Sequence, residues 1–440
     1  MLKKTMVLFL CSMLAAGSIF AAGQQEKDVQ KETEKRGDGQ VTITMSWWGD
    51  GKRNDVYNAV IDAFEKENPN IKVERTSANF SGYFDKLATQ FAGGAAPDLL
   101  GMHQRYASDY ASKGSFADLQ PFVDAGILDL SDIPSSIVES GKINGTLVFI
   151  PQGLSGMAVS YYTKTFDELG VEYPPLSWTW DDFEAKLVEI KKAADAKGMK
   201  DFWPCSDFSN DINNFNYWAR SKGEHAFSSD GKLGFSKDTL RSWLEFWKSL
   251  RDRGLVPDAE TTVEYAGGSY EQSLYANNNI AMSILPISQL WLYQNLVSEG
   301  EYRLVRFPKI KGGKNPELFS GASYTINAHS LHQKEAAMLM NFFLNNPEGQ
   351  RIFKQEQGLP PAKKALSIVK KGSNPAQLRS IEFVENSLVP NASPEPYPPA
   401  GFNEVNSNFT NCANAVSLGE KGIDQSVDDF FVAAQNILHK

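Results

Sequence analysis

The chain has 440 residues, with 44 basic and 53 acidic side chains and a formal net charge of −9. An acidic chain without a block of lysine and arginine is not expected to bind nucleic acid. A chain of this length normally divides into more than one domain, and its 42% apolar content is enough for two hydrophobic cores.

The first residues have the features of an export signal. Two lysines precede an apolar run over residues 6–20, and small residues follow at Ala22 and Gly23. The run is too short for a membrane span, and this order is typical of a signal peptide. We therefore expect a signal peptide over residues 1–23, cleaved near Ala22 or Gly23, and a periplasmic or secreted mature protein. Without the two lysines the charge becomes 42 − 53 = −11.

Three cysteines are present. Cys11 lies within the apolar run and follows the large Leu10, whereas bacterial lipoprotein signals place small residues just before the cysteine, so a free periplasmic protein is favoured over a lipoprotein. Cys205 and Cys412 are far apart and belong to no CxxC motif. The sequence leaves open whether they form one bridge or remain two buried thiols. Neither a metal nor another cofactor is expected.

The hydrophobic periodicity changes along the next part of the chain. Residues 24–40 are polar and charged, which predicts a disordered leader. Alternating apolar residues predict a strand from residue 41, and shorter apolar runs predict strands at residues 71–73 and 99–102. Apolar residues at helical spacing predict helices in between, over residues 56–64 and 83–91.

Further elements are expected downstream. A short strand is predicted at residues 147–150, and an extended pattern resumes at residues 158–164. A helix should start at Thr179, because Asp182 three residues later completes a capping-box pattern.

The segments FEKENPNIKVE, YFDKLATQFAGGAAPDLL and HQRY, with NNPEGQRIFKQEQGLPPAKKA further on, together resemble extracellular solute-binding protein family 1. These are the maltose-binding-protein-like sugar-binding proteins of bacterial ABC importers. The resemblance implies an α/β, class II periplasmic-binding-protein fold, in which two lobes are joined by a hinge. It implies an N-terminal lobe of residues 41–152 plus 305–345, and a C-terminal lobe of residues 153–304 plus 346–440. Residues 320–324 and 335–344 resemble a strand and a helix of the same family, and this resemblance implies that the Pro-rich loop over residues 390–399 lies near a cleft.

Sugar binding needs aromatic faces for the C–H surfaces of the rings and polar groups for the hydroxyls. Loops at the carboxyl ends of strands face the ligand crevice in lobes of this kind. With the resemblance, these requirements give the expected ligand-binding residues: Trp48, Asp50, Arg53, Asn79, Gln104, Arg105, Gly156, Tyr162, Trp218, Gln289, Trp291, Ser320 and Tyr397.

Several of these residues have alternative structural roles. Strict alternation along the first strand would bury one member of the Trp47–Trp48 pair and expose the other. Asn79 precedes a helix and is also a candidate N-cap. Trp218 is also a candidate for packing within a helical core, and Arg105 for an ion pair with an acidic neighbour.

We expect periplasmic binding of a di- or oligosaccharide by a monomer that delivers it to the membrane permease of an ABC importer. One alternative is a ferric-ion or anion binder of the same fold. Iron-binding proteins of this architecture use adjacent tyrosines as ligands, and this chain has such a pair at Tyr161 and Tyr162. A secreted polysaccharide-degrading enzyme is a third hypothesis, but the HExxH, GxSxG and P-loop motifs are absent. No catalytic residue is therefore expected. Whether the sugar is neutral or a uronate, held by arginines such as Arg53 and Arg105, stays open.

Overall fold

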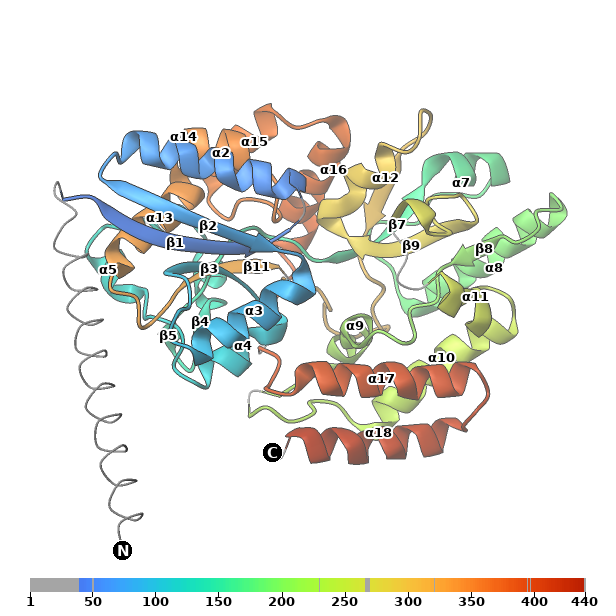
Figure 1. The fold of residues 1–440 in the computed structure, drawn as a ribbon. Helices are drawn as coiled ribbons and strands as arrows, with labels where there is room; N and C mark the ends of the chain where they lie inside the picture. The colour runs from blue at the N-terminus through green and yellow to red at the C-terminus, as the bar shows by residue number, and fades with distance from the viewer. Residues whose placement is uncertain are drawn as a thin grey trace, which may run out of the picture.

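The structure is a computed structural model that describes residues 39–49, 51–228, 230–265, 270–319, 321–393, 395 and 397–438. The predicted signal peptide and nearly all of the leader lie outside the described residues, as do Asp50 and Ser320. The described part forms two lobes, each built on a sheet flanked by helices (Figure 1). The predicted α/β class and two-lobed architecture are confirmed.

The sheet of the first lobe has the order β2–β1–β3–β11–β6. Its strands are β1 (Val41–Trp48), β2 (Ile71–Ala78), β3 (Leu99–His103), β6 (Ile150–Pro151) and β11 (Ala322–Ile326). The strand β1 pairs in parallel with both β2 and β3, while β11 runs antiparallel to β3 and β6. The carboxyl ends of β1 and β3 therefore meet at one edge of the sheet.

Helices cover both faces of this sheet. One face packs against α2 (Gly51–Glu67) and α13 (Gln333–Asn345), and the other against α3 (Phe80–Ala92) and α4 (Gln104–Ala111). The same lobe contains α5 (Gln120–Asp124), α6 (Ser135–Glu139) and the hairpin of β4 (Lys142–Ile143) and β5 (Thr146–Leu147). The predicted alternation of strands and helices from residue 41 to 103 is confirmed.

The chain after residue 346 packs differently from the expectation that it all lies in the second lobe. The helix α14 (Pro347–Phe353) packs against α2 and α13, and α15 (Lys363–Lys371) packs against α13 and α14. Phe353 and Ala365 belong to the apolar core of the first lobe. The physical reason is that α2 and α13 leave apolar surface on this side of the sheet, which α14 and α15 bury.

The sheet of the second lobe has the order β10–β7–β9–β8. Its strands are β7 (Met157–Tyr162), β8 (Trp203–Cys205), β9 (Ile280–Pro286) and β10 (Tyr302–Val305). The main core packs this sheet against α7 (Thr163–Leu169), α8 (Trp180–Ala196), α9 (Ile212–Lys222), α10 (Lys237–Asp252), α17 (Phe402–Ser417) and α18 (Ile423–Leu438). Thr179 and Asp182 form the predicted capping box of α8.

Smaller elements complete this lobe and its junction with the first. They are α11 (Ala259–Glu264), η1 (Tyr270–Gln272), η2 (Ile287–Gln289), α12 (Leu290–Gln294), α16 (Pro375–Phe383) and η3 (Val384–Leu388). The helix α16 contacts α12 and β10 of the second lobe, while its Ile381 and Phe383 belong to the apolar core of the first lobe, so it bridges the two lobes.

Three segments of the described chain pass between the lobes. The first is residues 151–157, the second is residues 305–319 with 321, and the third is residues 388–393, 395 and 397–402. In the first segment, Leu154 exchanges two backbone hydrogen bonds with Leu359, with N–O distances of 2.6 and 2.8 Å. A Cβ on Gly153 would lie 2.6 Å from the Gln357 carbonyl oxygen, so glycine permits this close approach. The contact fixes the first crossing segment to the part of the chain that follows α14.

Candidate ligand-binding cavity between the lobes

A cavity of about 1250 Å³ lies between the lobes. We call its two sides the first-lobe wall, formed by the loops after β1 and β3 and by the segment after α14, and the second-lobe wall, formed by the start of α9 and the residues after β9. Glu395, from the third crossing segment, also lines the cavity. This volume exceeds the 300–1,000 Å³ that is usual for small-molecule pockets, so there is room for more than one sugar ring.

Both tryptophans of the first strand are buried, contrary to strict alternation. The Trp47 ring stacks on Tyr57 of α2 with centroids 4.7 Å apart, while Trp48 packs among the aromatic side chains of α3. Both are buried because helices cover both faces of β1, which is an inner strand. Trp48 still lines the cavity at 7% exposure, so it presents an edge there and not a free face.

Trp291 is the better stacking platform. It lies in α12 on the second-lobe wall, is half-buried, and makes no ring contact with another described aromatic residue. Gln289 precedes it, lines the same wall and makes no side-chain hydrogen bond to a described residue. A half-buried indole without an aromatic partner can cover the C–H face of a sugar ring, and the uncommitted amide beside it can bond an adjacent hydroxyl.

The polar residues after β3 lie on the first-lobe wall. Gln104 and Arg105 begin α4, and neither side chain makes a hydrogen bond or ion pair with a described residue. His103 caps this helix through Nδ1, which accepts from the Arg105 amide at 3.3 Å. Burial and the neighbouring Arg105 guanidinium lower the pKa of His103 to about 4. The ring is therefore neutral at pH 7, with its proton on Nε2.

Arg53 has a structural role as well as a place on the wall. Its Nε donates to Glu356 Oε1 at 2.7 Å, and its Nη1 donates to the Trp48 carbonyl at 3.3 Å. The pair joins the start of α2 to the segment after α14. Lys52 and Lys354 lie nearby on the same wall, and neither side chain has a hydrogen-bond or ion-pair partner among the described residues.

The second-lobe wall is rich in asparagine. Asp211 caps α9 by accepting from the amides of Asn213 and Asn214. The Asn214 side chain is 2% exposed, and its Oδ1 has no hydrogen-bond partner. A buried acceptor left unpaired costs about 1–3 kcal/mol, so a ligand hydroxyl that donates to Asn214 would recover this energy.

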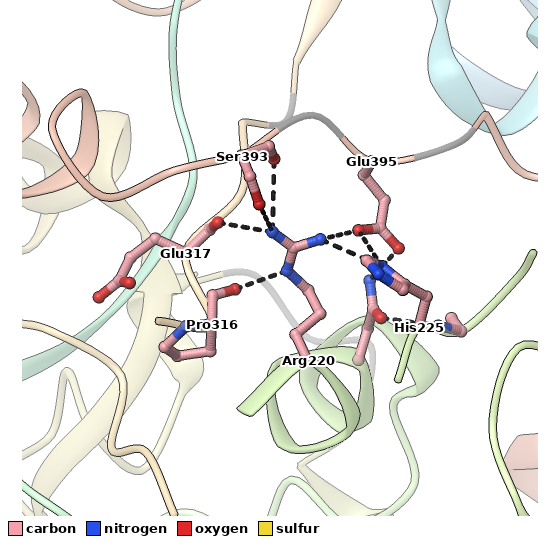
Figure 2. A network of polar contacts seen from close by, with 8 residues as sticks. Arg220, His225, Pro316, Glu317, Ser393 and Glu395 are labelled. Carbon is pink, nitrogen blue, oxygen red and sulfur yellow. Dashed lines mark hydrogen bonds and ion pairs between the residues drawn. The ribbon is translucent and has the colours of Figure 1, made fainter. Parts of the chain in front are cut away.

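A buried arginine holds Glu395 beside this wall (Figure 2). Arg220 donates to the Glu395 carboxylate, to Ser393 Oγ at 2.6 Å, and to the Pro316 and Glu317 carbonyls at 2.9 and 3.0 Å. The Glu395 carboxylate also accepts from Asn216 Nδ2 at 3.1 Å. Its position is therefore fixed by contacts from α9 before any ligand arrives.

Of the residues predicted to bind ligand, Trp48, Arg53, Gln104, Arg105, Gln289 and Trp291 line the large cavity. Tyr397 lies at an adjoining space of about 60 Å³, which shares Gln104 and Glu395 with the large one. Its hydroxyl donates to the Ser140 carbonyl at 2.9 Å, and its ring packs on Phe149.

Four other candidates lie elsewhere. Asn79 is the N-cap of α3, accepting from the Gly82 amide at 2.9 Å. Tyr162 stacks on Tyr302 because β7 is an inner strand with both faces covered. Trp218 faces Trp180 and other rings of the second core, since its side of α9 turns away from the cavity. Gly156 does not line the large cavity, because its Cα side faces Leu318 and Leu388.

Sequence reasoning missed the asparagines of α9, the residues after α14, and Glu395. The pattern Asp-Ile-Asn-Asn at residues 211–214 does signal a helix start. Nothing in it indicates that this start faces the opposite lobe. Glu356 and Gln357 come from a segment that the sequence assigned to the other lobe.

Three negative observations concern the described residues alone. No group of three or more His, Cys, Asp or Glu side chains there could hold a metal ion. None of the helices in the described ranges is long and apolar enough to cross a membrane. The question left open for Cys205 and Cys412 is answered: both are free and buried.

Residues 50–351 match the family described as bacterial extracellular solute-binding protein. The chain belongs to this family. It is 20% identical to the galactooligosaccharide-binding protein of Bacillus subtilis, over 97% of this chain and 96% of that protein. It is 23% identical to the multiple sugar-binding protein of Streptococcus mutans, over 84% of this chain and 85% of that protein. A solved periplasmic solute-binding protein from Pectobacterium atrosepticum superposes with a TM-score of 0.79 at 26% identity, covering 91% of this chain and 99% of that one. The family is one of solute-binding proteins and not of enzymes.

Proposed function

We propose that this protein binds a di- or oligosaccharide in the cavity between its lobes and delivers it to the permease of an ABC importer. The observation that supports this most directly is that Trp291, half-buried and without an aromatic partner among the described residues, lines a cavity too large for a single ring beside uncommitted amides. The sugar-binding names of relatives that align over most of the chain agree with it.

Closure of the lobes about the three crossing segments would enclose the ligand, as in other hinged binding proteins. We further propose that the mature chain begins after Ala22 or Gly23, acts as a monomer in the periplasm, and is not anchored through Cys11. Mass spectrometry of the secreted protein and light scattering test these points directly.

The ferric-ion alternative was motivated by a pair of adjacent tyrosines, and in the structure this pair does not reach the cavity. Tyr161 and Tyr162 are 5% and 4% exposed, and neither lines the cavity. The Tyr162 hydroxyl donates to the Glu299 carbonyl at 2.6 Å, so it is already committed.

The function is tested by titrating the mature protein with mono- and oligosaccharides and with Fe³⁺, following tryptophan fluorescence and melting temperature. At a ligand concentration one hundred times Kd, binding stabilises the fold by about 2.7 kcal/mol, which raises the melting temperature by several degrees. A shift with oligosaccharides is expected. A coloured tyrosinate complex with iron, and no shift with any sugar, would refute the proposal.

A further inference from the structure

The ionic side chains of the cavity are distributed unevenly. Lys52, Arg53, Arg105 and Lys354 lie on the first-lobe wall, and Asp211, Glu271, Glu356 and Glu395 also line the cavity. The numbers of positive and negative groups are equal, but the two sets differ in how far hydrogen bonds and ion pairs within the protein engage them.

Every one of these carboxylates is engaged. Glu356 is paired with Arg53, and Glu395 with Arg220. Asp211 accepts two amides as the cap of α9, and Glu271 interacts with Tyr270. By contrast, the side chains of Lys52, Arg105 and Lys354 make no hydrogen bond or ion pair with a described residue. The first-lobe wall therefore has unneutralised positive charge in a protein whose overall charge is strongly negative.

Two further features add positive potential at the same wall. The helix α4 starts there, and it has no acidic residue in its first turn. Helix N-termini carry about half a positive charge, which acidic side chains commonly offset. His103 also contributes a donor, because its Nδ1 already accepts from Arg105 and its proton lies on Nε2.

The opposite side presents acceptors. The Asn214 Oδ1 is buried without a partner. The Glu395 carboxylate is held at the cavity by Arg220 (Figure 2) and also accepts a hydrogen bond from Asn216. These groups suit the hydroxyls of a sugar, which donate to them. The first-lobe wall therefore suits negatively charged groups of the ligand, and the opposite side of the cavity suits its hydroxyl groups.

We infer that the ligand is an acidic carbohydrate, a uronate-containing di- or oligosaccharide. Its carboxylates lie against Lys52, Arg105 and Lys354, and its hydroxyls donate to Asn214 and Glu395. The three cations come from three separate elements, which suits a ligand with one carboxylate on each ring. This inference rests on the proposed function and names the substrate class for the same cavity.

The test compares matched disaccharides by calorimetry on the mature protein. Each pair, such as α-1,4-digalacturonate and α-1,4-galactobiose, differs only by carboxylate against hydroxymethyl, and glucose- and mannose-based pairs cover the other configurations. We expect the acidic member of one pair to bind at least tenfold more tightly, with an advantage that shrinks from 50 to 300 mM NaCl. Equal or tighter binding of the neutral member would overturn this inference and leave the proposed function intact. No binding of any sugar would overturn both.

Variants then assign the contacts. Arg105→Gln, Lys52→Gln and Lys354→Gln should each weaken binding of the acidic member about tenfold, while the neutral member changes less than twofold. Lys66→Gln, at the far end of α2, is the matched control and should affect neither. Asn214→Ala should weaken both members equally, because it acts on hydroxyls. Equal losses for both members with Arg105→Gln would contradict the assignment of the carboxylate to this wall.

Discussion

The buried arginine behind Glu395 gives the sharpest test of how the cavity is built. Replacing Arg220 by Met keeps an unbranched apolar stem but removes the guanidinium group, with its charge and its donors. The Glu395 carboxylate then loses its cationic partner, and the Pro316 carbonyl and the Ser393 hydroxyl each lose a hydrogen bond.

The size of the effect follows from burial. The Arg220 side chain is 2% exposed and that of Glu395 is 17%. Removing one partner of a buried ion pair typically costs 3–5 kcal/mol. Because Glu395 keeps its bonds to Asn216 and His225 and has some access to water, the lower end applies. We expect a loss of about 3 kcal/mol, a large part of the 5–15 kcal/mol by which proteins are usually stable.

Urea denaturation followed by far-UV circular dichroism measures this loss. The matched control is Arg351→Met, whose ion pair with Glu348 has both side chains more than half exposed. Exposed pairs contribute about 0–1 kcal/mol, so this variant should unfold close to the wild type. The double variant Arg220→Met with Glu395→Gln should regain part of the loss, since the neutral amide leaves no unpaired charge.

Two results would refute the reasoning. One is a change in unfolding free energy for Arg220→Met no larger than that for Arg351→Met. The other is strict additivity of the two substitutions in the double variant, which would mean that the pair is not coupled.

Three further predictions follow from the burial of single residues. Trp291→Ala should weaken sugar binding tenfold or more with little change in melting temperature, whereas Trp48→Ala should cost about 3–5 kcal/mol of stability. Calorimetry measures the loss of binding, and urea denaturation measures the loss of stability. A large loss of stability with Trp291→Ala and none with Trp48→Ala would contradict the roles assigned to the two residues. The lowered pKa of His103 means that the unfolded chain binds this proton more tightly, so its contribution to stability is complete above about pH 6.5 and is lost as the pH falls toward 4. His103→Asn keeps an N-cap acceptor but cannot titrate. Between pH 7 and 4.5 the unfolding free energy of the wild type should therefore fall by on the order of 2–3 kcal/mol more than that of this variant. Parallel profiles of unfolding free energy against pH would disprove the effect. Burial raises the pKa of Cys412 to about 12 and that of Cys205 still further, so neither thiol of the mature protein should react with Ellman's reagent until denaturant is added, when two should react.

Local elements of the first lobe were predictable because their patterns are local. The alternation along residues 41–47 and the helical stripes that follow depend only on neighbouring residues, and the structure has β1, α2, β2, α3 and β3 in that order. The capping box of Thr179 and Asp182 spans four residues and was likewise predictable.

The position of α14 and α15 was not predictable in this way. An amphipathic pattern shows that a helix buries one face, but not which of two available cores receives it. The same limit applies to Trp48, since alternation cannot show that both faces of β1 are covered by helices.

The candidate cavity was predictable only in part. Residues that follow strand ends, such as Gln104 and Arg105, were found because the carboxyl ends of strands face the crevice. Asn214, Lys354 and Glu395 lie far apart in sequence and meet only through the arrangement of the lobes. Their roles depend on tertiary contacts, above all those of Arg220, which no local pattern contains.

The order of strands in the first sheet has a consequence for how the protein reaches its native state. The strand β11 lies between β3 and β6, although the whole second-lobe sheet separates it from them along the chain. Until residues 322–326 have been synthesised, β3 has an open edge and β6 has no neighbour in the sheet. Pairing over such long sequence separations slows folding. The nascent first lobe should therefore stay incomplete through most of translation, a delay that would favour the export proposed for this chain.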